Sequence, residues 1–258
     1  MGLFDRTAKR LADGPTLIMA ADPGDTVAEL LLAYDPAMRA QGGRFVLGNG
    51  VRLCGPVELT PDLTQQAGLP VSMTAAYYAD VVKARPRGSR PGQAKWQDAE
   101  LLVRGLAQRL GATVHDARPP MKVNLAASVY SAQPIPVAEV ISLLQPFTDD
   151  ELFVQEDDDV PDAYFLVSEQ EPRFLTVYWP RRLSRSPLAQ PPPALGSLRD
   201  EAPCRWELGT KFPVADADRE IRLTVGEAAL ALANRVAGIV IDPYGFPVTR
   251  AEDLLPRR

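Results

Sequence analysis

The chain has 258 residues and a formal net charge of −5 at pH 7, with 46% hydrophobic and 24% charged residues. This length and composition suffice for a buried core without disulfides or metals, and they exclude wholesale disorder. The negative charge excludes a surface that attracts nucleic acid over its whole extent, so a contact with DNA or RNA has to be local.

The cysteines and the N-terminus indicate the compartment. Cys54 and Cys204 lie far apart in no C-x-x-C pair, so we expect reduced core thiols rather than a secreted disulfide framework. The N-terminal segment carries charges within its short apolar stretch, unlike a signal peptide, and no uncharged apolar window reaches 18 residues. We expect a cytoplasmic protein without a membrane partner. Its excess of arginine over lysine is typical of a GC-rich bacterial genome.

Strands and helices alternate along the first half of the chain. Gly48-Asn49-Gly50 predicts a type I′ hairpin, because Asn-Gly tolerates positive φ angles. Alternating residues from Val71 to Val81 predict a half-buried strand. Helices are expected after Asp25 and Asp98, since aspartate accepts hydrogen bonds from the free N–H groups of a helix start. Further strands are expected at residues 16–20, 44–48, 51–59 and 112–116.

The second half shows similar patterns. Thr224 to Glu227 forms a capping box, which predicts a helix start there. Alternation from Cys204 to Phe212 predicts a strand with one polar face. The proline-rich residues 180–203 are interpreted as an exposed loop with polyproline character. Further strands are expected at residues 123–131, 151–155, 163–168, 173–179 and 238–242.

An internal repeat relates the two halves. LAQRLGATVHD at 106–116 aligns without gaps on LANRVAGIVID at 232–242, with five identities in eleven positions, and VAELLLAYDP at 27–36 aligns on VAEVISLLQP at 137–146. The apolar helix faces coincide as well, which chance identity has no reason to preserve. In the first pair these faces comprise Ala99, Leu102, Val103, Leu106 and Leu110, which match Val225, Ala228, Ala229, Leu232 and Val236.

These patterns predict an α+β fold made of two tandem, diverged ferredoxin-like units of βαβββαβ type, with mostly antiparallel sheets and two helices each. We expect a first repeat at residues 1–118 and a second at 121–258, with the proline-rich insertion at about 180–203. Pro119-Pro120 is the predicted joint. Two fused copies imitate a homodimer, so a pseudo-twofold axis is expected to relate them.

A basic loop at residues 83–97 is the strongest candidate for binding. It has no acidic residue before Trp96, and arginines offer paired donors to phosphates or to an acidic partner. A solvated loop of the same composition is the commoner case. The candidate residues for binding a partner or an anion are Arg85, Arg87, Arg90, Lys95 and Trp96.

Catalytic and metal motifs do not stand out. His115 is the one histidine, and no G-x-S-x-G elbow or phosphate-binding loop occurs. The acidic run at 149–162 lacks the glycine and glutamate spacing of an EF-hand, so a solvated acidic loop is favoured. We expect no metal and no cofactor.

Three functions remain open. The first is a non-catalytic module for assembly, immunity or scaffolding, which binds another protein or a small anionic ligand through paired sheets and exposed loops. The second is an enzyme with a pocket between the repeats that uses carboxylates, arginines and Tyr77 or Tyr78. The third, which the net charge disfavours, is local nucleic-acid binding by the basic loop 83–97.

Overall fold

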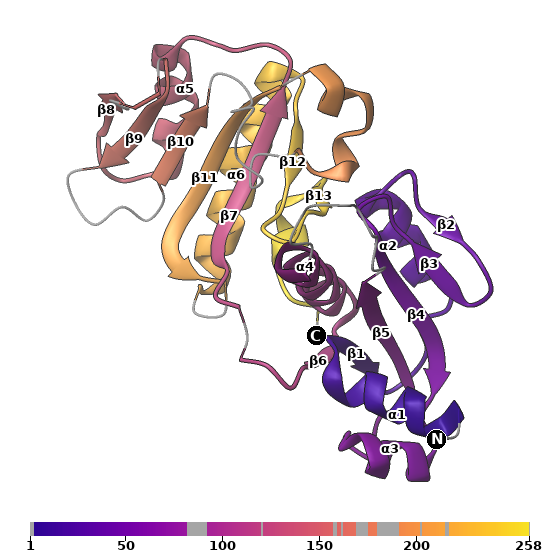
Figure 1. The fold of residues 1–258 in the computed structure, drawn as a ribbon. Helices are drawn as coiled ribbons and strands as arrows, with labels where there is room; N and C mark the ends of the chain where they lie inside the picture. The colour runs from indigo at the N-terminus through magenta and orange to yellow at the C-terminus, as the bar shows by residue number, and fades with distance from the viewer. Residues whose placement is uncertain are drawn as a thin grey trace. The chain divides into compact units, whose positions relative to one another are not determined.

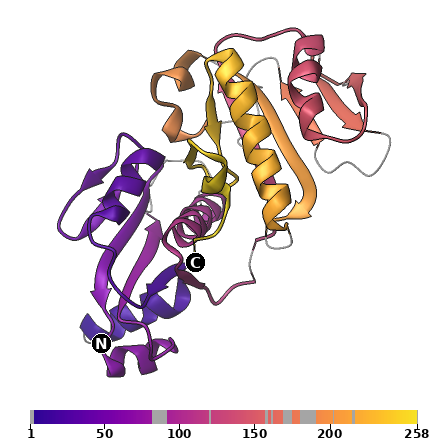
Figure 2. The same cartoon turned by 180° about the vertical axis from the view of Figure 1, so that it is seen from behind.

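The computed structural model describes residues 3–81, 92–119, 121–156, 159–160, 162–168, 175–179, 191–201, 203–214 and 217–257. The protein is α+β with antiparallel sheets (Figures 1 and 2). It divides into two compact units: unit 1 is Met1–Met121 with Pro256–Arg258, and unit 2 is Lys122–Leu255. No helix in the described parts of the chain is long and apolar enough to cross a membrane.

Unit 1 has one six-stranded sheet in the order β2-β3-β4-β5-β1-β6. Its helices are α1 (Leu3–Asp13), α2 (Thr26–Tyr34), α3 (Pro61–Ala67) and α4 (Gly92–Leu110). Its strands are β1 (Thr16–Met19), β2 (Arg39–Ala40), β3 (Arg44–Val46), β4 (Val51–Glu58), β5 (Ala75–Val81) and β6 (Thr113–His115).

Both faces of the unit 1 sheet are covered. Ile18 and Ala76 pair in register and pack in one cluster with residues of α1 and α3. Their neighbours Leu17 and Tyr77 point to the opposite face, because side chains alternate along a strand, and both are buried. Helix α4 packs against β1, β4 and β5. The sheet is therefore a central layer, which explains why its strands carry few exposed apolar residues.

Unit 2 has one seven-stranded sheet in the order β13-β12-β7-β11-β10-β9-β8. Its strands are β7 (Asn124–Ser131), β8 (Leu152–Glu156), β9 (Tyr164–Ser168), β10 (Leu175–Trp179), β11 (Cys204–Pro213), β12 (Ile239–Ile241) and β13 (Pro247–Val248). Its helices are α5 (Val137–Leu144) and α6 (Arg219–Val236), with short 3₁₀ segments η1 (Gln145–Phe147), η3 (Pro193–Glu201) and η4 (Ala251–Leu254).

Aromatic side chains form the centre of the unit 2 core. Tyr178 stacks on Tyr164 with ring centroids 4.8 Å apart and lies 5.1 Å from Trp206, which is fully buried. Burial raises the pKa of Tyr164 to about 12. Residues of α5 and α6 join this cluster, so the two helices cover the face of the sheet that carries Trp206.

The two sheets share one order of strands. Counted from β8, the second sheet runs β8-β9-β10-β11-β7-β12, and the first runs β2-β3-β4-β5-β1-β6. In each sheet, three consecutive strands precede the strand that leads into the long helix, which is β5 in unit 1 and β11 in unit 2. The first strand of the unit, β1 or β7, lies next to that strand. Helices α4 and α6 end at Leu110 and Val236, and the following strands begin at Thr113 and Ile239, which gives the offset of 126 residues seen in the sequence.

Several local predictions are wrong. Helix α4 begins at Gly92 rather than near Asp98. Helix α6 begins at Arg219 rather than near Thr224, because Asp218 caps it by accepting a hydrogen bond from the Ile221 N–H. Strand β5 begins only at Ala75, and Val71 is 86% exposed.

Two further segments differ from the sequence interpretation. Residues 191–201 of the proline-rich stretch are not an exposed loop: η3 buries Leu195 against Tyr130 and Ile241, because apolar residues follow the three prolines and pack together there. The hairpin at Gly48-Asn49-Gly50 is present, but its loop is longer than a type I′ turn, and the Leu47 N–H bonds to the Val51 carbonyl.

Candidate anion-binding site

Helix α1 presents a row of charged side chains. Ala8 and Leu11 are buried in the core with α3 and β1, which fixes the orientation of the helix. The residues on the opposite side are exposed, and they are Arg6, Lys9, Arg10 and Asp13. The helix ends at Asp13, and a Cβ atom on the following Gly14 would lie 3.2 Å from the Arg10 carbonyl oxygen and 3.6 Å from the Trp96 ring. Glycine thus relieves a tight approach to the last turn of α1, next to Trp96.

Trp96 of α4 stacks with an arginine from the turn after β6. The Arg118 guanidinium carbon lies 3.5 Å from the centre of the indole ring, which is a cation–π contact. Asp116 fixes this turn, because its Oδ1 accepts a hydrogen bond of 3.0 Å from the Arg118 N–H. The flat guanidinium therefore covers the indole ring while it keeps N–H donors at its edge.

These groups surround a pocket of about 550 Å³ within unit 1. The described residues that line it are Arg6, Lys9, Arg10, Asp13, Gly14, Ala79, Trp96 and Arg118. Four of these side chains are cationic and one is a carboxylate, which leaves a surplus of three positive charges. This surplus lies on a chain whose net charge is −5, so the pocket is a local positive site.

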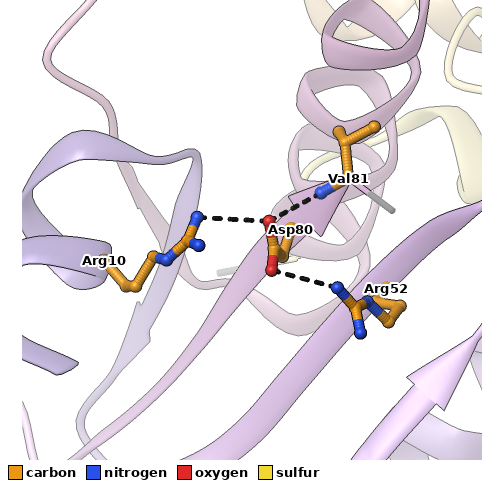
Figure 3. Close-up of polar contacts among 4 residues, drawn as sticks. All are labelled: Arg10, Arg52, Asp80 and Val81. Carbon is orange, nitrogen blue, oxygen red and sulfur yellow. Dashed lines mark hydrogen bonds and ion pairs between the residues drawn. The ribbon is translucent and has the colours of Figure 1, made fainter. Parts of the chain in front are cut away.

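Asp80 at the end of β5 holds two arginines next to the pocket (Figure 3). Its Oδ1 lies 3.2 Å from Nη1 of Arg10, and its Oδ2 lies 3.3 Å from Nη2 of Arg52 on β4. Oδ1 also accepts a hydrogen bond of 2.9 Å from the Val81 N–H. Arg10 is 57% exposed and Asp80 22%, so the pair is screened by solvent and can exchange with a competing anion. Asp80 and Arg52 cancel in charge, and the surplus of three remains.

One donor in the pocket wall is unused. Among the described residues, the Nε1 atom of Trp96 is buried and has no hydrogen-bond partner. Buried polar groups in native proteins nearly always have a partner, since an unpaired donor costs about 1–3 kcal/mol. Because the atom has almost no accessible surface, a ligand in the pocket does not reach it without a movement of the wall.

The tyrosines proposed for catalysis lie elsewhere. The Tyr77 hydroxyl donates a hydrogen bond of 2.9 Å to Asp22 Oδ1, and burial, followed by this contact, raises the pKa of Tyr77. Tyr78 lies opposite Cys54 across β5 and β4, and burial raises the pKa of both groups. Both tyrosines and the thiol are thus protonated at neutral pH, which does not suit a base or a nucleophile. Both cysteines are buried and form no disulfide, as expected.

The sequence-predicted site residues have different outcomes. Trp96 lies in the pocket wall. Lys95 lies on α4, but its side chain is outside the described part of the structure. Arg85, Arg87 and Arg90 fall outside the described residues, so their role stays a prediction.

The cations of the pocket were not predicted from the sequence: these are Arg6, Lys9, Arg10 and Arg118. The signal that could have found those on α1 is the spacing of Arg6, Lys9, Arg10 and Asp13 opposite Ala8 and Leu11. This spacing is typical of an amphipathic helix. Within the described ranges, no group of three or more histidine, cysteine or acidic side chains is placed to hold a metal ion.

Unit 2 has a different arrangement at the positions that match Trp96 and Arg118. With the offset of 126, these positions are Arg222 and Tyr244. Arg222 is 7% exposed and donates from Nε to Ala217 O at 3.0 Å, from Nη1 to Leu254 O at 3.0 Å, and from Nη2 to Val214 O. Burial lowers the pKa of Arg222, and Tyr244 acts electrostatically against this shift.

The turn that carries Tyr244 resembles the turn that carries Arg118. Asp242 Oδ1 accepts a hydrogen bond of 2.9 Å from the Tyr244 N–H, as Asp116 does from the Arg118 N–H. The helix position is aromatic and the turn position cationic in unit 1, whereas unit 2 has the reverse. In unit 2 the arginine, Arg222, donates hydrogen bonds to backbone carbonyl oxygens of the same unit.

No family model, curated protein sequence or solved structure matched the chain in comparisons with known proteins. A function is therefore inferred from the geometry of the pocket.

Proposed function

We propose that the protein is a non-catalytic binding module and that the pocket of unit 1 binds an anionic group of a ligand or partner. The observation that carries this proposal is the set of four cationic side chains that line one pocket together with the Arg118–Trp96 stack. Charge-assisted hydrogen bonds from arginine are among the stronger polar contacts in proteins. None of the described lining residues is a histidine, cysteine or serine, which favours binding over covalent or proton-transfer chemistry.

A row of exposed cations on a helix is more often solvated than functional. Two features argue for binding in this case. The cations of α1 lie beside a concave site rather than on a convex surface. The stack on Trp96 also holds the Arg118 guanidinium in place, so part of the entropic cost of ordering that side chain is met before binding.

Anion binding is tested by calorimetric titration of the full chain with pyrophosphate and with citrate. Arg118→Gln is compared with Arg219→Gln, a control that removes the same charge from an exposed position of α6. We expect wild type to bind at least one anion and Arg118→Gln to bind it at least about ten-fold more weakly, because hydrogen bonds to charged groups contribute about 1.5–3 kcal/mol.

Arg219→Gln should bind as wild type does. Equal losses in the two variants would mean that only net charge matters, and the pocket would then not be the site. Absence of binding by both anions at millimolar concentration would also contradict the proposal.

We further propose that the units are diverged copies of a ferredoxin-like βαββαβ core, extended by β2 and β3 in unit 1 and by β8, β9 and β13 in unit 2. Support comes from the shared strand order, the offset of 126 residues across the long helix and the following strand, and the paired Asp116 and Asp242 turns. An experimental structure in which β1 and β7 occupied different places in their sheets would contradict the duplication.

The enzyme alternative requires a pocket between the repeats and stays a prediction. Nucleic-acid binding by the loop 83–97 also stays a prediction, which the net charge disfavours.

A further inference from the structure

The pocket contains donors that come from two separate segments of the chain. Arg6, Lys9 and Arg10 belong to α1, and Arg118 belongs to the turn after β6. A planar carboxylate accepts hydrogen bonds in one plane around two oxygens. A phosphate group has at least three acceptor oxygens in a tetrahedral arrangement, so it can bond to donors that approach from different sides.

The charge of the pocket favours an anion with more than one charge. The lining has a surplus of three positive charges, which a single carboxylate would reduce by only one. Phosphate esters carry a charge of about −1.5 to −2 at neutral pH. A phosphate monoester or a diphosphate therefore matches the pocket better than a monocarboxylate does.

The pocket is larger than a phosphate group alone. Its volume of about 550 Å³ lies within the range of about 300–1,000 Å³ that is common for sites of small organic ligands. Asp13, the one described carboxylate in the lining, would repel a second anionic group nearby and would accept a hydrogen bond from a hydroxyl. The organic part of the ligand is thus expected to be uncharged and hydroxylated.

Arg118 supplies the orienting donors beside Trp96. Its guanidinium covers one face of the indole ring, and its side chain is exposed. The indole Nε1 is itself buried, so the ring shapes the pocket wall and the guanidinium edge is the group that a phosphate oxygen would meet.

We propose that the pocket of unit 1 binds a small hydroxylated organic phosphate, a phosphate monoester or diphosphate, with one phosphate oxygen accepting hydrogen bonds from the Arg118 guanidinium. This inference rests on the anion-binding function proposed above and specifies the class of ligand.

The test follows the three indole N–H signals in ¹H–¹⁵N spectra of the full chain during titration with glycerol phosphate, pyrophosphate and citrate. The chain has three tryptophans, and Trp96→Phe identifies the Trp96 signal by its loss. We expect both phosphate probes to shift this signal and to bind at least about ten-fold more tightly than citrate. Trp96→Phe keeps a ring under Arg118 and should bind glycerol phosphate within about two-fold of wild type, whereas Arg118→Gln should bind it at least about ten-fold more weakly.

The outcomes separate this inference from the broader function. Citrate binding as tight as that of the phosphates, with Arg118→Gln still impaired, would overturn the ligand class and leave anion binding intact. Phosphate binding with an unmoved Trp96 signal would place the ligand away from the pocket wall and overturn the proposed site. Binding of a single-stranded oligonucleotide that depends on Arg118, without binding of either small phosphate, would overturn the small-molecule class. Failure of all anions to bind would overturn both proposals.

Discussion

Replacement of Arg222 by methionine is expected to destabilise unit 2 strongly. The guanidinium is 7% exposed and supplies donors to three carbonyl oxygens, those of Ala217, Val214 and Leu254. Each buried carbonyl left without a donor costs about 1–3 kcal/mol, and the apolar methionine recovers part of this by removing a buried charge. We expect a net loss of about 3–5 kcal/mol.

The tightness of the site prevents an easy repair by rearrangement. Segment η4, which supplies the Leu254 carbonyl, packs so closely on α6 that a Cβ atom on Gly226 would lie 2.9 Å from the Ala251 Cα. Water therefore has little room to enter between helix and segment and to replace the lost donors. The cost should stay near the upper part of the range.

Urea unfolding followed by tryptophan fluorescence measures this loss. In a Trp96→Phe background, the remaining Trp179 and Trp206 both belong to unit 2 and report on its unfolding. With a slope of about 1.5–2 kcal/mol per M, the midpoint should fall by about 2 M. Arg219→Met is the control, since Arg219 is exposed in the first turn of the same helix. A loss below about 1 kcal/mol for Arg222→Met, or equal losses for both variants, would refute the reasoning.

Three further predictions concern charge. Asp80→Asn should free Arg10 and remove a negative charge next to the pocket. For an assumed separation of about 8 Å from the ligand and an effective dielectric constant of about 40, the repulsion removed is about 1 kcal/mol. Calorimetry should then show pyrophosphate binding about five-fold tighter, and weaker binding would contradict this. Replacing Arg85, Arg87 and Arg90 by alanine should weaken pyrophosphate binding without changing Tm, and unchanged affinity would remove the loop from the site. Burial alone would raise the pKa of Asp253, but hydrogen bonds from Thr249 and Arg250 outweigh it and lower the pKa. The Asp253 carboxylate thus stabilises the fold above about pH 4, and this stabilisation is lost as the pH falls through the lowered pKa. In urea, Asp253→Asn should therefore be less stable than wild type at pH 6 and resemble it near pH 2. An equal deficit at both pH values would contradict the linkage.

Much of the strand pattern could be predicted from the sequence. Strands that are short, apolar and bounded by turn residues, such as β7 and β12, begin and end within about one residue of their expected positions. The apolar face of α4 was also predicted correctly, with Leu102 and Leu106 fully buried. These features depend on local periodicity, which a sequence displays directly.

The site was predictable only in part. Trp96 was identified because it follows a run of basic residues, but Arg118 lies 22 positions later and reaches the pocket only through the pairing of β6 with β1. Helix α1 was missed because its apolar residues are few and its first turn includes no strong cap. Short-range patterns do not reveal contacts that depend on the tertiary arrangement of a sheet and two helices.

The three bonds made by Arg222 bear on the proposed duplication. All three nitrogen atoms of this buried guanidinium donate to backbone carbonyls, so the side chain strengthens the fold and is not accessible to a ligand. If the two units are diverged copies, as proposed above, the matching helix position of unit 1 holds Trp96 instead, and the exposed Arg118 of the turn is available for binding. Exchange of an aromatic and a cationic side chain between the helix and the turn can thus stabilise one unit and leave the other able to bind a ligand.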